Sequence, residues 1–197
     1  MTEEEVNVKF LEMNKEIFTK KLNIDLDKCY NNLNAIFNNV INAFQKDMEL
    51  RIYEISFDSE SILTREEIEI KTKEYFNTLK EYIAIEINKN ESLLIDTINN
   101  QDLNNYVNII TMCGNNLYNG ISELYLKQIK LLLNDLGNKL DVYSKARLEK
   151  IINEIIYDHF MERCKMTIDS IHNILINNVH SNELYLDNMN KSTIKSH

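Results

Sequence analysis

The chain of 197 residues contains no proline, no tryptophan and only three glycines, at positions 114, 120 and 137. Proline removes a backbone donor and clashes with the preceding helical turn, and glycine weakens helices entropically. Average composition would supply about 5% proline and 7% glycine, so the residues that tight turns, strands and glycine-rich nucleotide loops require are largely missing. This absence favours a protein built almost entirely from long α-helices.

Basic side chains are also in short supply. The chain has 22 Lys and Arg against 31 Asp and Glu, which gives a formal net charge of −9. No basic run is longer than Lys20-Lys21. Nucleic-acid binding requires a basic face that displaces phosphate counterions, so we expect no nucleic-acid partner.

A secretory leader and a long apolar run are absent as well. The first six residues, Met-Thr-Glu-Glu-Glu-Val, are acidic where a leader is basic. No run approaches the roughly 20 apolar residues that cross a bilayer. We therefore expect no membrane partner and a cytoplasmic location, or a place within a virus particle if the chain is phage-encoded.

Cys29, Cys113 and Cys164 are odd in number and widely spaced, which predicts reduced thiols on apolar helical faces.

Apolar residues recur every three or four positions along most of the chain. The clearest stripe runs from Leu26 to Ile55 and predicts one face of an α-helix about 45–50 Å long. A shorter helix over about 3–22 precedes it, with a possible joint at 23–25. Further stripes predict helices over about 65–98 and 103–136, and a last one from Asp141 or Ser144 to about residue 178.

Several helix ends carry recognisable signals. Thr2 with Glu5, and Thr64 with Glu67, match the capping box in which a hydroxyl and a glutamate satisfy two free backbone N–H groups. Gly137 follows the third stripe and is expected to stop that helix in a left-handed conformation.

These patterns predict an all-α fold, an elongated antiparallel bundle of four to five long helices with coiled-coil-like packing. Residues 1–180 are expected to form a single bundle domain. Residues 181–197 are rich in Ser, Asn and Lys, and this composition predicts a flexible, disordered C-terminal tail.

The most unusual local feature is the pair Gly114 and Gly120 inside a helical stripe, since each costs about 1 kcal/mol relative to alanine. A kink, a break between two helices or a close helix crossing would explain them. The alternative is a hinge or partner surface that includes Tyr118 and Tyr125. The spacing is not a phosphate-binding loop, because Lys-Ser/Thr does not follow the second glycine.

Catalytic and metal-binding patterns are weak. Asp169 and His172 lie one helical turn apart, but a di-iron bundle needs Glu-x-x-His from two helices, and no histidine precedes His159. Cys164 and His159 point to different sides of one helix, so no activated thiolate is predicted. We expect no catalytic residues, no cofactor and no bound metal.

The sequence thus predicts a non-enzymatic interaction or assembly protein that acts through helical surfaces on a protein partner or on a second copy. It would be a scaffold, an adaptor or a structural component, a phage or virus particle being one setting. The alternative is a regulatory or ligand-sensing domain with a pocket between helices near residues 114–120, whose ligand the sequence does not identify. A metal-dependent bundle enzyme is a less favoured third hypothesis.

Overall fold

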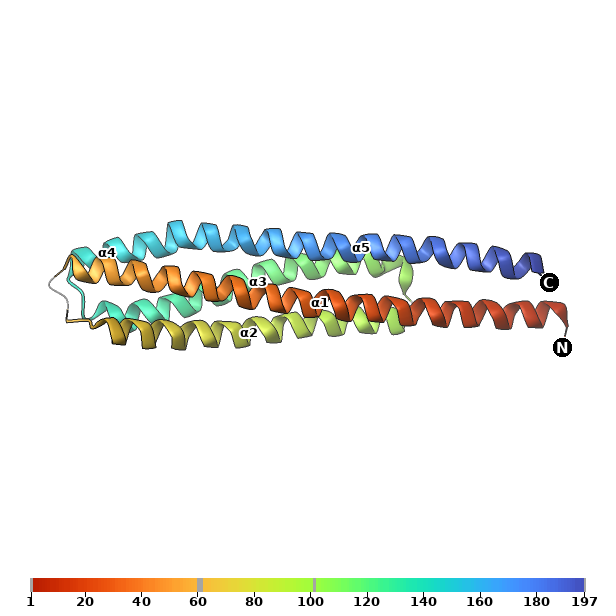
Figure 1. Ribbon diagram of the computed structural model, residues 1–197, viewed down its shortest axis with the longest axis horizontal. Helices are drawn as coiled ribbons and strands as arrows, with labels where there is room; N and C mark the ends of the chain where they lie inside the picture. Colours follow the sequence, from red (N-terminus) through yellow and green to blue (C-terminus); the bar gives the residue numbers. More distant parts are fainter. Residues whose placement is uncertain (1, 60–61, 101, 197) are drawn as a thin grey trace.

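The computed structural model describes residues 2–59, 62–100 and 102–196, and these ranges fold into a long helical rod (Figure 1). Its elements are α1 (Glu3–Phe57), α2 (Arg65–Asn99), α3 (Leu103–Gly137), α4 (Val142–Lys150), the π-helical segment η1 (Ile151–Ile156) and α5 (Tyr157–Ser196). The backbone stays helical through both ends of η1, so α4, η1 and α5 form one continuous helix. The predicted all-α, elongated antiparallel bundle is confirmed.

The bundle has a four-helix cross-section. α1 packs on α2 and α5, and α3 packs on the same two helices. Of these four adjacent pairs, α3 and α5 pack least extensively. One continuous apolar core runs along the rod, and its largest fully buried side chains include Tyr30, Phe37, Phe76, Tyr106, Tyr125 and Phe160.

The predicted joint at 23–25 does not exist, because α1 runs through it without interruption. Its polar residues bond to neighbouring helices instead of ending the helix. The Asn23 amide donates to Asn99 Oδ1 at the end of α2, across 3.2 Å, and Asp25 accepts from the Asn182 amide of α5, across 2.9 Å. Two consecutive apolar stripes therefore belong to one helix of 55 residues.

The predicted N-terminal caps are largely confirmed. Thr2 and Glu5 form both halves of the capping box at the start of α1. The Thr64 hydroxyl accepts from the Glu67 backbone N–H, but the Glu67 carboxylate accepts from Lys139 Nζ across 2.8 Å. Glu67 therefore connects the start of α2 to the chain just after α3 and does not complete a capping box. Asp141 caps α4 by accepting from Ser144 N–H.

The prediction of a left-handed stop at Gly137 is wrong. Gly137 is the last helical residue of α3, and the following Asn138 is right-handed, with φ −65° and ψ −20°. A Cβ atom at position 137 would lie 2.8 Å from Lys145 Cε. The glycine thus provides space for the Lys145 side chain at the turn into α4.

The C-terminal segment differs from the flexible tail predicted from residue 181, because α5 remains helical to Ser196. The reason is a partner that the sequence pattern did not reveal: the start of α1 runs beside it past the α2–α3 turn (Figure 1). The Asn14 amide donates to Asn190 Oδ1 across 3.1 Å, and the Lys21 ammonium lies 4.7 Å from the centre of the Tyr185 ring. We call residues 3–22 of α1 and 183–196 of α5 the two-helix extension.

Candidate functional site

The two glycines of α3 lie in an unbroken helix, so they do not mark a break between two shorter helices, which was one of the alternatives. A Cβ atom at Gly114 would lie 3.5 Å from Ile168 Cγ2, and one at Gly120 would lie 3.5 Å from Glu86 Oε2. Both are ordinary van der Waals distances. A close helix crossing therefore does not explain either glycine, although each costs α3 about 1 kcal/mol relative to alanine.

Gly114 lies in a cleft between α3 and α5, the least extensively packed pair of adjacent helices. The cleft has a volume of about 370 Å³. Its buried floor consists of Ile110, Ile168 and the ring of His172. Exposed polar side chains form its rim: Thr111 and Asn115 on α3, and Lys165, Asp169 and Asn173 on α5.

His172 connects the floor of this cleft to α1. Its Nδ1 lies 2.7 Å from the Ile168 carbonyl oxygen, which can only accept, so Nδ1 carries the proton. Nε2 is then the acceptor for the Tyr30 hydroxyl, 2.9 Å away. Burial lowers the pKa of His172 from its ordinary value of 6.5, while the Ile168 carbonyl and Asp169 oppose this shift. His172 is therefore neutral, with both ring nitrogens occupied, and is not available as a metal ligand.

The two predicted surface tyrosines have different environments. Tyr118 is half-buried and lines the cleft beside Gly114. Tyr125 is fully buried and stacks on Phe160 at a centroid distance of 4.6 Å, so it forms core and not a partner surface. Gly120 does not line the cleft; its nearest side-chain neighbour is Glu86 of α2. The structure therefore brings together only Gly114 and Tyr118 of the four candidates, and the hinge remains a prediction.

The three cysteines are buried and unpaired. Burial raises the pKa of the Cys113 thiol to about 11 and that of Cys164 to about 12. The Cys29 pKa is also raised, by burial first and by Asp25 second. Thiols in such surroundings pack as small apolar groups and stay protonated at neutral pH.

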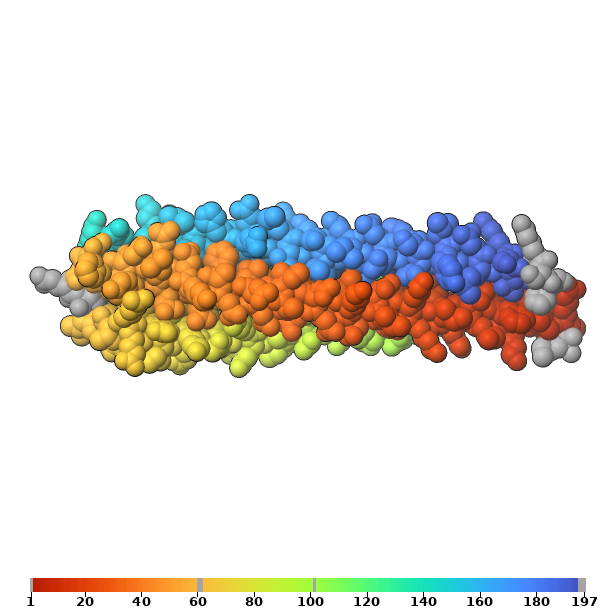
Figure 2. Space-filling view, viewed as in Figure 1, coloured from red at the N-terminus to blue at the C-terminus, as the bar shows by residue number. Residues whose placement is uncertain are grey.

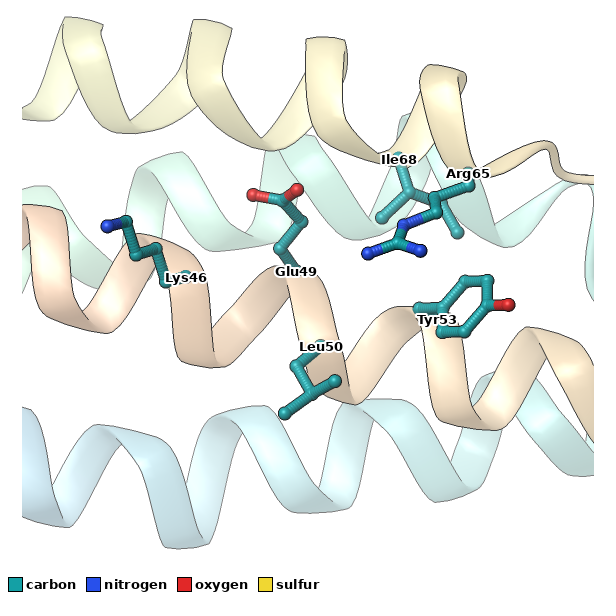
Figure 3. A pocket seen from close by; sticks show the side chains of 6 residues that line it. All are labelled: Lys46, Glu49, Leu50, Tyr53, Arg65 and Ile68. Carbon is teal, nitrogen blue, oxygen red and sulfur yellow. The ribbon is translucent and has the colours of Figure 1, made fainter.

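A second groove, of about 270 Å³, lies between α1 and α2 and is lined by Lys46, Glu49, Leu50, Tyr53, Arg65 and Ile68 (Figure 3). The Arg65 guanidinium is 5.2 Å from the centre of the Tyr53 ring, so cation–π contact already engages it. Burial raises the pKa of Glu49, with Glu69 adding to the shift and Arg65 opposing it. None of the residues singled out by the sequence lies in this groove.

The two-helix extension carries a group of exposed apolar side chains. On α1 they follow the helical spacing Phe10, Met13 and Ile17, and on α5 they include Leu184 and Tyr185. Ile17 and Tyr185 lie together along the groove between the two helices. Figure 2 shows α1 and α5 side by side along the visible face, down to this end of the rod. In the extension only α1 and α5 cover each other's apolar side chains, whereas elsewhere in the rod four helices do so.

The opposite end of the rod carries a smaller apolar group. Phe57, Ile62, Val142 and Tyr143 lie on or beside the two turns at this end and are 75–87% exposed. Large apolar side chains gathered in this way on a surface are typical of interaction sites. We call these four residues the apolar tip.

No protein-family model matches this sequence, and neither curated proteins nor solved structures give a significant match. Within the described parts of the chain, no helix combines the length and apolar character needed to cross a bilayer. The same residues include no group of three or more His, Cys, Asp or Glu side chains placed to hold a metal ion.

Sequence reasoning missed the Tyr30–His172 hydrogen bond and the cleft beside it. Tyr30 lies on an apolar stripe and His172 follows Ile171 on another, 142 positions along the chain. No local pattern connects two such stripes, because only the packing of α5 on α1 determines which positions face each other. The local signals that pointed to this region were Gly114 with Tyr118 on α3 and the Asp169–His172 spacing on α5, which the sequence pattern did not connect.

Proposed function

We propose that the protein is a non-enzymatic assembly component that associates with a second copy of itself through the two-helix extension. The observation that supports this proposal is the set of exposed apolar side chains on that extension: Val8, Phe10, Met13, Ile17, Leu184, Tyr185 and Ile194. Large apolar side chains gathered on an exposed surface favour an interface, and Ile17 and Tyr185 lie together along the groove between the two helices.

The architecture of the chain favours a second copy of the same chain as the partner for this surface. Elsewhere in the rod four helices share one core, whereas the extension has only α1 and α5. Two extensions packed against each other would restore a four-helix cross-section. The spacing of Phe10, Met13 and Ile17 matches the three- and four-residue steps by which helices pack in bundles.

The test is the molar mass in solution, measured by light scattering and sedimentation over a wide concentration range. We expect the native chain to form a dimer or larger species and Ile17→Lys to form monomers. Ile85→Lys is the matched control, since Ile85 is 50% exposed and Ile17 is 48% exposed, yet Ile85 lies on α2, outside the extension. It should associate like the native chain.

Three outcomes contradict the proposal. The first is a native chain that stays monomeric at all concentrations. The second is equal loss of association in both variants, because the effect would then come from added charge alone. The third is association that survives Ile17→Lys but is lost in Tyr143→Glu, which would place the interface at the apolar tip.

A further inference from the structure

We propose that the α3–α5 cleft binds a small α-amino acid with an apolar side chain. The cleft volume of about 370 Å³ falls at the lower end of the range of small-molecule sites, roughly 300–1,000 Å³. The proposal does not depend on self-association, because none of the residues that line the cleft belongs to the two-helix extension.

The floor of the cleft suits an apolar side chain. Ile110 and Ile168 are buried there, and both nitrogens of His172 are already bonded, one to Tyr30 and one to the Ile168 carbonyl. The imidazole therefore has no free donor or acceptor for a ligand. A hydrocarbon group on this floor would be removed from water without leaving a buried polar atom unpaired.

The rim suits a zwitterion. Lys165 and Asp169 lie one helical turn apart on α5, on the edge of the cleft, and neither forms an ion pair within the described part of the chain. The ligand carboxylate would pair with Lys165 and its ammonium with Asp169. The Asn115 and Asn173 amides on the same rim can add hydrogen bonds. One positive and one negative charge disfavour a ligand that carries only one of them.

Gly114 is the third element of the site. Its helix-propensity penalty has no packing explanation, since a Cβ atom would make only ordinary contacts with Ile168 and His172. The missing side chain does, however, keep the α3 wall of the cleft open. Gly120 carries the same penalty in the same helix without lining the cleft, and so it serves as a control.

The test uses the full-length chain, with calorimetric titration and thermal unfolding. The probes are L-leucine, isoamylamine, which lacks the carboxylate, and 4-methylpentanoate, which lacks the ammonium. We expect L-leucine to bind and to raise the unfolding temperature, because a ligand specific for the folded state stabilises it. Each analogue should bind at least about tenfold more weakly.

Variants then locate the site. Lys165→Gln and Asp169→Asn should each weaken L-leucine binding about tenfold. Gly114→Leu should abolish binding by filling the cleft, and Gly120→Ala should leave it unchanged. If circular dichroism shows that Gly114→Leu does not fold, Gly114→Ala replaces it, with weaker binding expected.

The proposal is overturned if none of the three probes binds at millimolar concentration. It is also overturned if the singly charged analogues bind as well as L-leucine, or if both charge variants retain native affinity. Equal loss of binding in the Gly114 and Gly120 variants would likewise count against it, since it would trace the effect to α3 as a whole.

Discussion

The Tyr30 hydroxyl donates a hydrogen bond to His172 Nε2 across 2.9 Å, deep in the core between α1 and α5. The two rings meet edge to face, with centroids 5.7 Å apart. Because His172 also donates to the Ile168 carbonyl, a polar ring is fully satisfied inside an apolar bundle. The pair joins α5 to α1 directly behind the α3–α5 cleft.

Tyr30→Phe should destabilise the protein by about 1–3 kcal/mol, because His172 Nε2 would be left buried without a donor. Tyr106→Phe is the matched control. The Tyr106 hydroxyl is buried and has no hydrogen-bond partner among the described residues, so its removal should be neutral or stabilising. Urea unfolding of both variants measures the difference. Equal destabilisation of the two would show that the Tyr30–His172 bond contributes nothing.

The free energy of unfolding should fall as the pH drops below about 6.5, the ordinary pKa of histidine. Burial lowers the pKa of His172 in the folded state, so below this pH the unfolded chain takes up a proton that the folded chain resists. Neutral His172 thus makes its full contribution to the free energy of unfolding above pH 6.5. That contribution is lost as the pH falls toward the folded-state pKa of His172. Tyr30 and Asp169 are titratable groups close to the ring, and Lys165 lines the same cleft.

His172→Gln isolates this effect, since glutamine does not titrate. The measurement compares unfolding free energies at pH about 7.5 and about 5.5 in both proteins. We expect the native chain to lose more stability than the variant over this interval. Identical losses would assign the pH dependence to other groups.

Gly120→Ala should stabilise the protein by up to about 1 kcal/mol, because alanine has the higher helix propensity and its Cβ fits 3.5 Å from Glu86 Oε2. Gly137→Ala should stabilise the protein less than Gly120→Ala does, or destabilise it. The alanine Cβ would lie 2.8 Å from Lys145 Cε and would displace that side chain. Chemical denaturation of the two variants gives the comparison. A larger gain at position 137 than at 120 would contradict the prediction.

Deletion of residues 181–197 should destabilise the start of α1. Phe18 and Asn14 would lose the cover of α5, and Asp25 would lose its hydrogen bond from Asn182. Hydrogen exchange should show weaker amide protection over residues 3–22, together with a lower unfolding temperature. Unchanged protection in the shortened chain would mean that the segment does not pack on α1 and that the flexible tail predicted from composition is the better description.

Much of the fold could be predicted because its determinants are local. The stripe from Leu26 to Ile55, the cap at Thr2 and the start of the last helix at Asp141 each depend on residues within a few turns of one another. The errors arose where a residue's partner is distant. The local pattern at Asn23 and Asp25 predicts a joint, because their partners, Asn99 and Asn182, are distant in the sequence and cannot be recognised from it.

The candidate site was predictable only in outline. The glycines drew attention to one stretch of α3, yet just Gly114 faces the cleft, and Tyr125 turned out to be core. Helical periodicity places a side chain on a face but does not say which helix covers that face. The rim charge Lys165 gave no signal, because exposed charges occur throughout such a chain, and Asp169 drew notice only as a possible metal ligand beside His172.

By itself, the sequence determined that this chain forms long helices, because it lacks proline, contains only three glycines and repeats apolar residues every three or four positions. Those properties act within single helices. The tertiary structure decided how the helices pair, and with that the Tyr30–His172 bond, the α3–α5 cleft and the helical state of residues 181–196. The physical reason is that burial depends on what lies opposite a side chain, and helix packing alone places residues from distant parts of the chain opposite each other.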